Sequence, residues 1–181
     1  LVFGARKQIF LTFGPWVLIR VYEFPATQIA KLLMVAAVIG LFFKPLAGRA
    51  IDRFGERKIL VADGLILIVV CIGYGYALRI TNDPSVARLV ACGCFIADNL
   101  LFTLGGARAI YVTRLTKSPQ EVTATLSMGV SINHIVSMSI PIVGGALWMT
   151  FGYEQVFLAA AVLAAGNAGL ACFVPRKGTY A

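Results

Sequence analysis

The sequence predicts an all-α integral membrane protein with six transmembrane helices in one bundle, and its composition and length carry that prediction. Hydrophobic residues make up 59% of the chain and charged residues only 13%, against about 45–50% and about 25% in soluble domains. With so little polar surface, the expected solvent is lipid. A helix needs about 20 mostly apolar residues to cross the hydrocarbon. The 181 residues therefore have room for six crossings and no second domain.

Six apolar runs fill the chain, and short breaks separate them. Pro25 follows the first run, and the other breaks lie at 48–58, 81–84, 117–120 and 151–153. Such tight connections are typical of helical hairpins. The expected helices are residues 8–24, 27–47, 59–78, 86–111, 122–151 and 155–174.

Lys and Arg residues are divided unequally between the two sides of this predicted bundle. Short cytoplasmic loops hold the excess of positive charge, so we expect both termini in the cytoplasm and a multi-pass protein of the plasma membrane or bacterial inner membrane. The formal net charge of +8 is spread between the apolar runs, which disfavours a nucleic-acid partner. The poorer side carries Arg20, Lys31, Arg79 and Arg88. The richer side carries Arg6, Lys7, Arg49, Arg53, Arg57, Lys58, Arg114, Lys117, Arg176 and Lys177.

The segment between the second and third runs is the most informative part of the sequence. It reads Gly48-Arg49-Ala50-Ile51-Asp52-Arg53-Phe54-Gly55-Glu56-Arg57-Lys58. Gly48 permits a close helix end, Asp52 can cap or pair at a helix terminus, and Gly55 allows the left-handed conformation of a tight turn. Arg57 and Lys58 suit the anionic cytoplasmic leaflet. The simpler interpretation is a basic loop that only fixes topology.

The spacing of this segment resembles the GxLxDRxGxRR loop of the major facilitator superfamily. Ala50 replaces the usual leucine, and Glu56 stands where a basic residue is common. The resemblance implies one six-helix half of a transporter, in which Asp52 and Arg53 form a conformational latch with Arg108 or Arg114. Residues 5–8 resemble the end of a cytoplasmic linker, which favours the C-terminal half. The matching positions are Gly48, Asp52, Arg53, Gly55, Arg57 and Lys58.

Two proline-containing segments predict helix kinks. In the fifth run, Pro141 removes a backbone hydrogen bond, while Gly144 and Gly145 let another helix approach closely. The segment 139–145 is similar to part of an antiporter motif of the same superfamily, but a packing kink is the favoured interpretation. In the first run, residues 13–16 predict a second kink, with a substrate-facing Trp as the alternative.

Polar residues near the middle of two runs are the candidate substrate or proton pathway. Asp98 and Asn99 lie halfway along the fourth run, and Asn133 and His134 halfway along the fifth. Ionisable groups at this depth are costly and default to functional hypotheses. We expect the two clusters to meet near the midplane, because the helices are hairpin neighbours. The resemblance implies that both helices line a central cavity, where an imidazole suits proton transfer; static interhelical hydrogen bonds are the alternative.

Other polar residues have simpler interpretations. Arg20, Lys31 and Lys44 lie near the ends of apolar runs and can snorkel, with substrate contact as the less favoured interpretation. Asp63 lies one turn into the third run, where the helix dipole stabilises a carboxylate.

Sequence signatures of enzymes, nucleotide sites and metal sites are absent. The chain has no GxxxxGK[ST], HExxH or GxSxG segment. Its four cysteines lie in apolar runs without CxxC spacing, which favours small buried hydrophobes. We therefore expect no catalytic residues, no metal and no cofactor.

The sequence-based hypothesis is half of a secondary transporter that moves a small solute by alternating access. Its expected partners are the solute, membrane lipids and a second six-helix bundle, which is either a missing half or an identical chain. Two alternatives stay open. One is a natural half-size transporter acting as a homodimer, and the other is a membrane scaffold or assembly protein that transports nothing.

Overall fold

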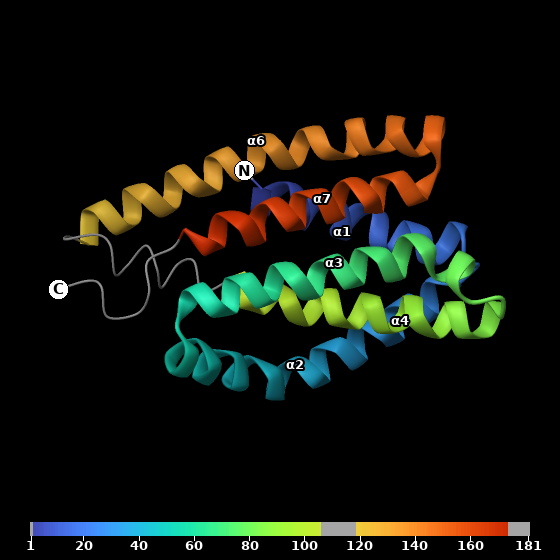
Figure 1. Ribbon diagram of the computed structural model, residues 1–181, viewed down its shortest axis with the longest axis horizontal. Helices are drawn as coiled ribbons and strands as arrows, with labels where there is room; N and C mark the ends of the chain where they lie inside the picture. Colours follow the sequence, from blue (N-terminus) through green and yellow to red (C-terminus); the bar gives the residue numbers. More distant parts are fainter. Residues whose placement is uncertain (1, 106–118, 174–181) are drawn as a thin grey trace.

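The computed structural model describes residues 2–105 and 119–173, and all regular structure in that part of the chain is helical. This confirms the predicted all-α class. Six helices in the described residues follow the order of the six expected runs, and a short 3-10 turn, η1 (Phe102–Gly105), follows the fourth (Figure 1). The expected end of the fourth run at residue 111 lies outside the described residues. The helices are α1 (Val2–Arg20), α2 (Ala26–Phe54), α3 (Glu56–Ile80), α4 (Pro84–Leu101), α6 (Pro119–Phe151) and α7 (Tyr153–Cys172).

Five of these helices are long and apolar enough to cross a membrane, judged by length and composition among the described residues. They are α2, α3, α4 extended by η1, α6 and α7. α1 has 19 residues and is not one of the five. Since Arg6, Lys7 and Arg20 lie within it, only a short apolar stretch remains.

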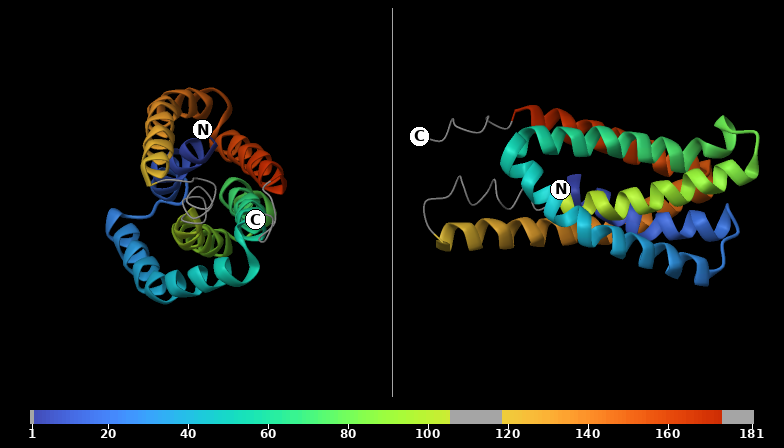
Figure 2. Two further views of the ribbon diagram at one scale, coloured as in Figure 1. Left: turned by 90° about the vertical axis from the view of Figure 1, so that its left-hand side faces the viewer. Right: turned by 90° about the horizontal axis from the view of Figure 1, so that it is seen from below.

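The helices run roughly along one long axis, and sequence neighbours do not always pack together. The main contacts connect α2 to α4, α4 to α3, and α3 to α7, while α1 packs on α6 and α7. Viewed end-on, α3 and α7 lie side by side, and α2 and α6 lie at separate edges of the bundle (Figure 2). This arrangement leaves α2 and α6 with the least buried surface of the five apolar helices.

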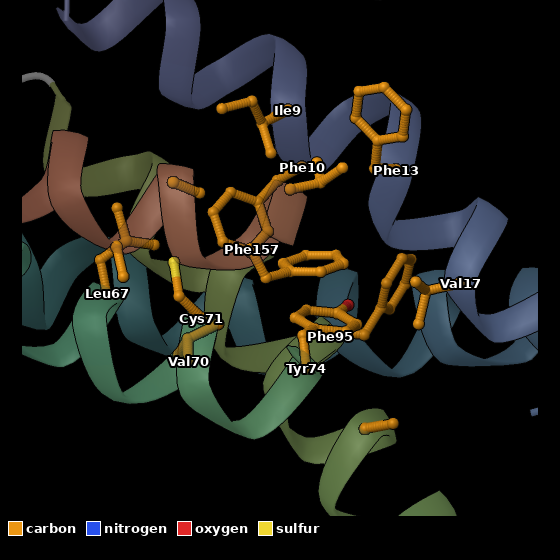
Figure 3. Close-up of a cluster of buried hydrophobic side chains, with 14 of the residues drawn as sticks. Ile9, Phe10, Phe13, Val17, Leu67, Val70, Cys71, Tyr74, Phe95 and Phe157 are labelled. Atoms are coloured by element: carbon orange, nitrogen blue, oxygen red, sulfur yellow. The ribbon is translucent and has the colours of Figure 1, made fainter. Parts of the chain in front are cut away.

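A cluster of aromatic rings fills the centre of the bundle. The rings of Tyr74 and Phe157 are stacked with centroids 5.0 Å apart, and Phe10 lies 5.9 Å from Tyr74 and 6.0 Å from Phe157 (Figure 3). All three side chains are buried. Such pairs contribute about 0.5–1.5 kcal/mol each beyond the area they bury. The cluster therefore joins α1, α3 and α7 at one point.

α3 and α7 approach each other closely because small residues lie at their contact. A Cβ atom added to Gly64 would lie 2.7 Å from the Cβ of Ala168, and one added to Gly75 would lie 3.2 Å from the Cβ of Phe157. Lipid supplies little hydrophobic driving force between helices, so close backbone approach is a main source of their affinity. The buried face of α7 consists largely of alanines at 160, 161, 164, 168 and 171.

Two helical hairpins turn on a single glycine. Gly55 connects α2 to α3 with φ 83° and ψ 158°, and Gly152 connects α6 to α7 with φ 94° and ψ 166°. Only glycine adopts this region without strain, because a Cβ atom would clash with the backbone. The two turns lie at opposite ends of the bundle (Figure 1).

The contact between Gly64 and Ala168 gives a testable prediction. Gly64→Ala places a methyl group against Ala168 and should lower the free energy of unfolding by about 1–3 kcal/mol, as overpacked cores do. Replacing Ala168 by Gly in the same chain should restore most of the loss. Both can be measured by thermal unfolding of the purified protein in detergent.

Gly169→Ala is the matched control, because a Cβ atom at Gly169 meets nothing within 4 Å. This variant gains the same helix propensity without a clash. Equal stability of the Gly64→Ala and Gly169→Ala variants would contradict the close packing of α3 on α7.

Candidate latch and substrate pathway

The latch segment is helical for most of its length, which corrects the prediction of a loop over residues 48–58. α2 continues through Gly48 to Phe54, and Gly55 is the one residue between α2 and α3. The expected helix end at Gly48 is wrong, since a lone glycine lowers helix stability by only about 1 kcal/mol. The end comes where the backbone adopts a conformation reserved for glycine. With 29 residues, α2 is about 44 Å long, so part of it extends beyond about 30 Å of hydrocarbon.

Most charged residues of the segment lie on the two helix turns that flank Gly55. Asp52 and Arg53 are exposed in the last turn of α2, and Arg57 and Lys58 lie in the first turn of α3. Ile51 is buried in a small apolar cluster with Leu60 of α3 and Ala171 of α7. The helix turn that carries Asp52 thus has its apolar side in this cluster.

A groove of about 690 Å³ lies beside this turn. Phe54 and Leu65 give it apolar walls, and Arg57 and Lys58 give it positive charge. The guanidinium of Arg53 lies 5.5 Å from the centre of the Phe54 ring. Arg108 and Arg114, the expected partners of Asp52, fall outside the described residues, so that pairing stays a prediction.

Glu56 and Asp63 are buried, which the sequence analysis did not predict for either residue. Their side chains are 3% and 1% exposed. They are two helix turns apart on the face of α3 that also buries Leu60 and Leu67. The periodicity of apolar residues along α3 was the available signal, because positions 56 and 63 fall in the same stripe. Glu56 therefore faces the interior, whereas a basic residue at that position would be expected at the surface.

Asp98 is half-buried on α4 and acts electrostatically on Tyr74 of the aromatic cluster. The Tyr74 hydroxyl is buried and has no hydrogen-bond partner among the described residues. It lies near Gly14, the residue before Pro15 of α1. Asn99 is exposed, and its amide donates to the Phe95 carbonyl oxygen at 2.8 Å within the same helix.

The other expected pathway cluster lies on α6, which shares no main contact with α4 among the described residues. Asn133 is half-buried and His134 is exposed, both on α6. Over the described residues, α4 packs mainly on α2 and α3, whereas α6 packs on α1 and α7. The expectation that the two clusters meet across packed hairpin neighbours is therefore wrong, because α1 takes the place beside α6.

The glycines beside Pro141 have different surroundings. A Cβ atom at Gly144 would lie 2.5 Å from the ring of Phe13, so α6 approaches α1 closely there. A Cβ atom at Gly145 would meet nothing within 4 Å. α6 is helical without interruption across Pro141.

Gly145 opens onto a cavity of about 450 Å³ between α1 and α6, here called the α1–α6 pocket. Trp16 and Trp148 stand in its walls with ring centroids 6.2 Å apart, and Phe13 stacks on Trp148 at 5.9 Å. Sequence reasoning missed Trp148 and interpreted Arg20 as a snorkelling residue. The four-residue spacing of Thr12, Trp16 and Arg20, which puts them on one face of α1, was the available signal. The pocket is lined by Thr12, Phe13, Trp16, Arg20, Pro141, Gly145, Trp148 and Met149.

Charged residues at the same end of the bundle form ion pairs. Arg79 of α3 bonds to Glu154 of α7 at 3.0 Å, and Arg88 of α4 lies 3.9 Å from Glu23. Exposed pairs of this kind contribute about 0–1 kcal/mol. Arg20 forms no ion pair with any residue in the described part of the chain.

The turn at Gly55 gives a second prediction. Gly55→Ala should lower the free energy of unfolding by about 1–3 kcal/mol, because alanine is strained at φ 83°. Gly48→Ala is the control within the same motif, since Gly48 is helical and open to substitution. Thermal unfolding in detergent compares the two variants. A Gly55→Ala protein as stable as Gly48→Ala would show that the turn does not require glycine.

Comparison with known proteins identifies the family. The sequence matches the family model of the Major Facilitator Superfamily over residues 2–180. Comparisons with curated proteins and with solved structures give no match. The family match covers nearly the whole chain and agrees with the helical bundle and its apolar helices. The chain therefore belongs to the Major Facilitator Superfamily, whose members are multi-pass membrane transporters.

Proposed function

We propose that this chain is one six-helix half of a secondary active transporter that moves a small solute by alternating access. The carrying observation is a polar stripe on α6, the helix with the least buried surface. Only 6% of the apolar 18-residue stretch of α6 is buried, against 44% of the corresponding stretch of α3. Ser127, Ser131 and His134 nevertheless stand exposed on it. Polar side chains at membrane depth face a cavity or a protein partner rather than lipid.

The polar stripe continues into the α1–α6 pocket. Residues 127, 131, 134, 141, 145 and 148 are spaced three, four or seven apart, which places them on one side of an α-helix. The last three of them line the pocket. Since α6 is continuous, His134 lies about 10 Å along the helix axis from Pro141. This geometry supports a path along α6 that leads from His134 to the pocket.

A second bundle is the proposed partner of this path. α2 and α6 expose large apolar side chains, among them Phe42, Ile142 and Met149. The second bundle is either a further segment of a longer protein or a second copy of this chain. Mass determination of the purified protein in detergent separates the two, because a homodimer doubles the mass. The latch of Asp52 and Arg53 would then lie between the two bundles on the cytoplasmic side of the membrane. Both termini would lie on that side too. Membrane lipids would occupy the groove beside Phe54.

His134 is the proposed carrier of a coupling proton, with Asp98 as the second candidate. Imidazole is the side chain whose ordinary titration range spans neutral pH, and it lies on the proposed path. Asp98 lies on α4 and acts electrostatically on Tyr74. Uniport is the alternative if neither residue couples proton and solute movement.

Transport in vesicles tests this function. The protein is reconstituted with an inward proton gradient, and uptake of labelled glucose, leucine, benzoate and choline is compared with that of empty vesicles. We expect gradient-stimulated uptake of at least one probe, and His134→Gln should reduce the stimulation at least tenfold. Thr150→Val is the control, because Thr150 is an exposed polar residue of α6 outside the stripe.

Other outcomes of this experiment would favour a different proton carrier, uniport or a scaffold function. Loss of stimulation only in Asp98→Asn would move the proton to Asp98, and unchanged stimulation in both variants would indicate uniport. Absence of uptake for every probe would favour a scaffold.

A further inference from the structure

The α1–α6 pocket indicates the chemical class of the solute. We propose that it binds a small organic anion with a flat aromatic or apolar body, held against the wall formed by Trp16 and Trp148 with its carboxylate at Arg20. This inference rests on the proposed transport function for its physiological meaning, but the binding it describes can be measured without transport.

The walls of the pocket suit a flat apolar body. Trp16 and Trp148 meet edge to face, and Phe13 stacks on Trp148. These contacts hold the Trp148 ring, while Trp16 is half exposed and lines the pocket. Aromatic walls bind planar ligands by stacking and by burial of apolar area. The volume of about 450 Å³ lies in the lower part of the usual range for small-molecule sites.

The charge of the pocket selects an anion. Tryptophan faces also attract cations, but Arg20 puts a positive charge at the pocket and no carboxylate stands among its described lining residues. Arg79 and Arg88 at the same end are engaged by Glu154 and Glu23. Arg20 forms no such pair in the part of the chain that the structure describes, so its guanidinium can donate two parallel hydrogen bonds to a carboxylate.

Two adjacent glycines of α6 have different roles, one in helix packing and the other in the pocket. Gly144 lies against the ring of Phe13 and sets the distance between α1 and α6. Gly145 faces open space in the pocket. A side chain added at Gly145 therefore occupies the space for a ligand without displacing α1.

Binding of three matched probes to the purified full chain tests the proposal. The probes are 2-naphthoate, the neutral 2-naphthamide and the cationic 2-naphthylmethylammonium, each measured by equilibrium binding of the labelled compound. We expect 2-naphthoate to bind at least tenfold more tightly than the other two. Arg20→Gln should remove that preference and Arg20→Lys should keep part of it.

Two further variants complete the test. Lys31→Gln is the control, because Lys31 is exposed at the same end of the bundle and does not line the pocket. It should leave binding unchanged. Gly145→Leu should weaken 2-naphthoate binding at least tenfold, and Gly145→Ala, with a smaller side chain, should weaken it less. Gel filtration and thermal unfolding confirm that the variants are folded.

The outcomes separate this proposal from the transport function. Equal binding of the three probes, no binding of any probe, or equal effects of Arg20→Gln and Lys31→Gln would overturn the anion site. Uptake of another solute that is unaffected by Gly145→Leu would also overturn it while leaving the transporter intact. Specific 2-naphthoate binding without uptake of any solute would support the pocket and contradict the transport function.

Discussion

The close packing of α3 on α7 is the interaction on which the rest of the bundle depends. Gly64 and the alanine face of α7 bring the two helices together where lipid provides no hydrophobic force between them. α4 then packs on α3, and α1 packs on α7. Tyr74 and Phe157 stack across it and receive Phe10 from α1. Four helices are thereby fixed, and α2 and α6 lie at the edges of that group.

This division of the bundle supports the proposed function. A fixed group of helices provides a frame, and the least buried helix carries the polar stripe and one wall of the pocket. Since α6 contacts α1 through Gly144 and Phe13, the pocket depends on how closely these two helices approach. We therefore expect changes at the α1–α6 contact to alter solute binding more than changes between α3 and α7, which alter stability.

Much of the fold could be predicted from the sequence, because the number and order of membrane helices follow from hydropathy along the chain. The end of α2 could not, since hydropathy falls at Gly48 but the helix ends only where Gly55 takes a glycine-only conformation. The separation of Asp98 from His134 could not be predicted either, because the sequence of each helix does not show which other helices it packs against. The pocket was missed for the same reason. Trp16 and Trp148 are far apart in the sequence, and only the packing of α1 on α6 brings them together.

The single-residue turns at Gly55 and Gly152 restrict how the edge helices can move. A connection of one residue is too short to let a helix slide along the bundle unless the neighbouring helix moves with it. α3 and α7 are packed against each other and cannot move apart easily. The motion that remains is a tilt of α6 about Gly152 and a tilt of α2 about Gly55. The two pivots lie at opposite ends of the molecule (Figure 1). We expect tilting of α2 and tilting of α6 to open the bundle toward opposite sides of the membrane.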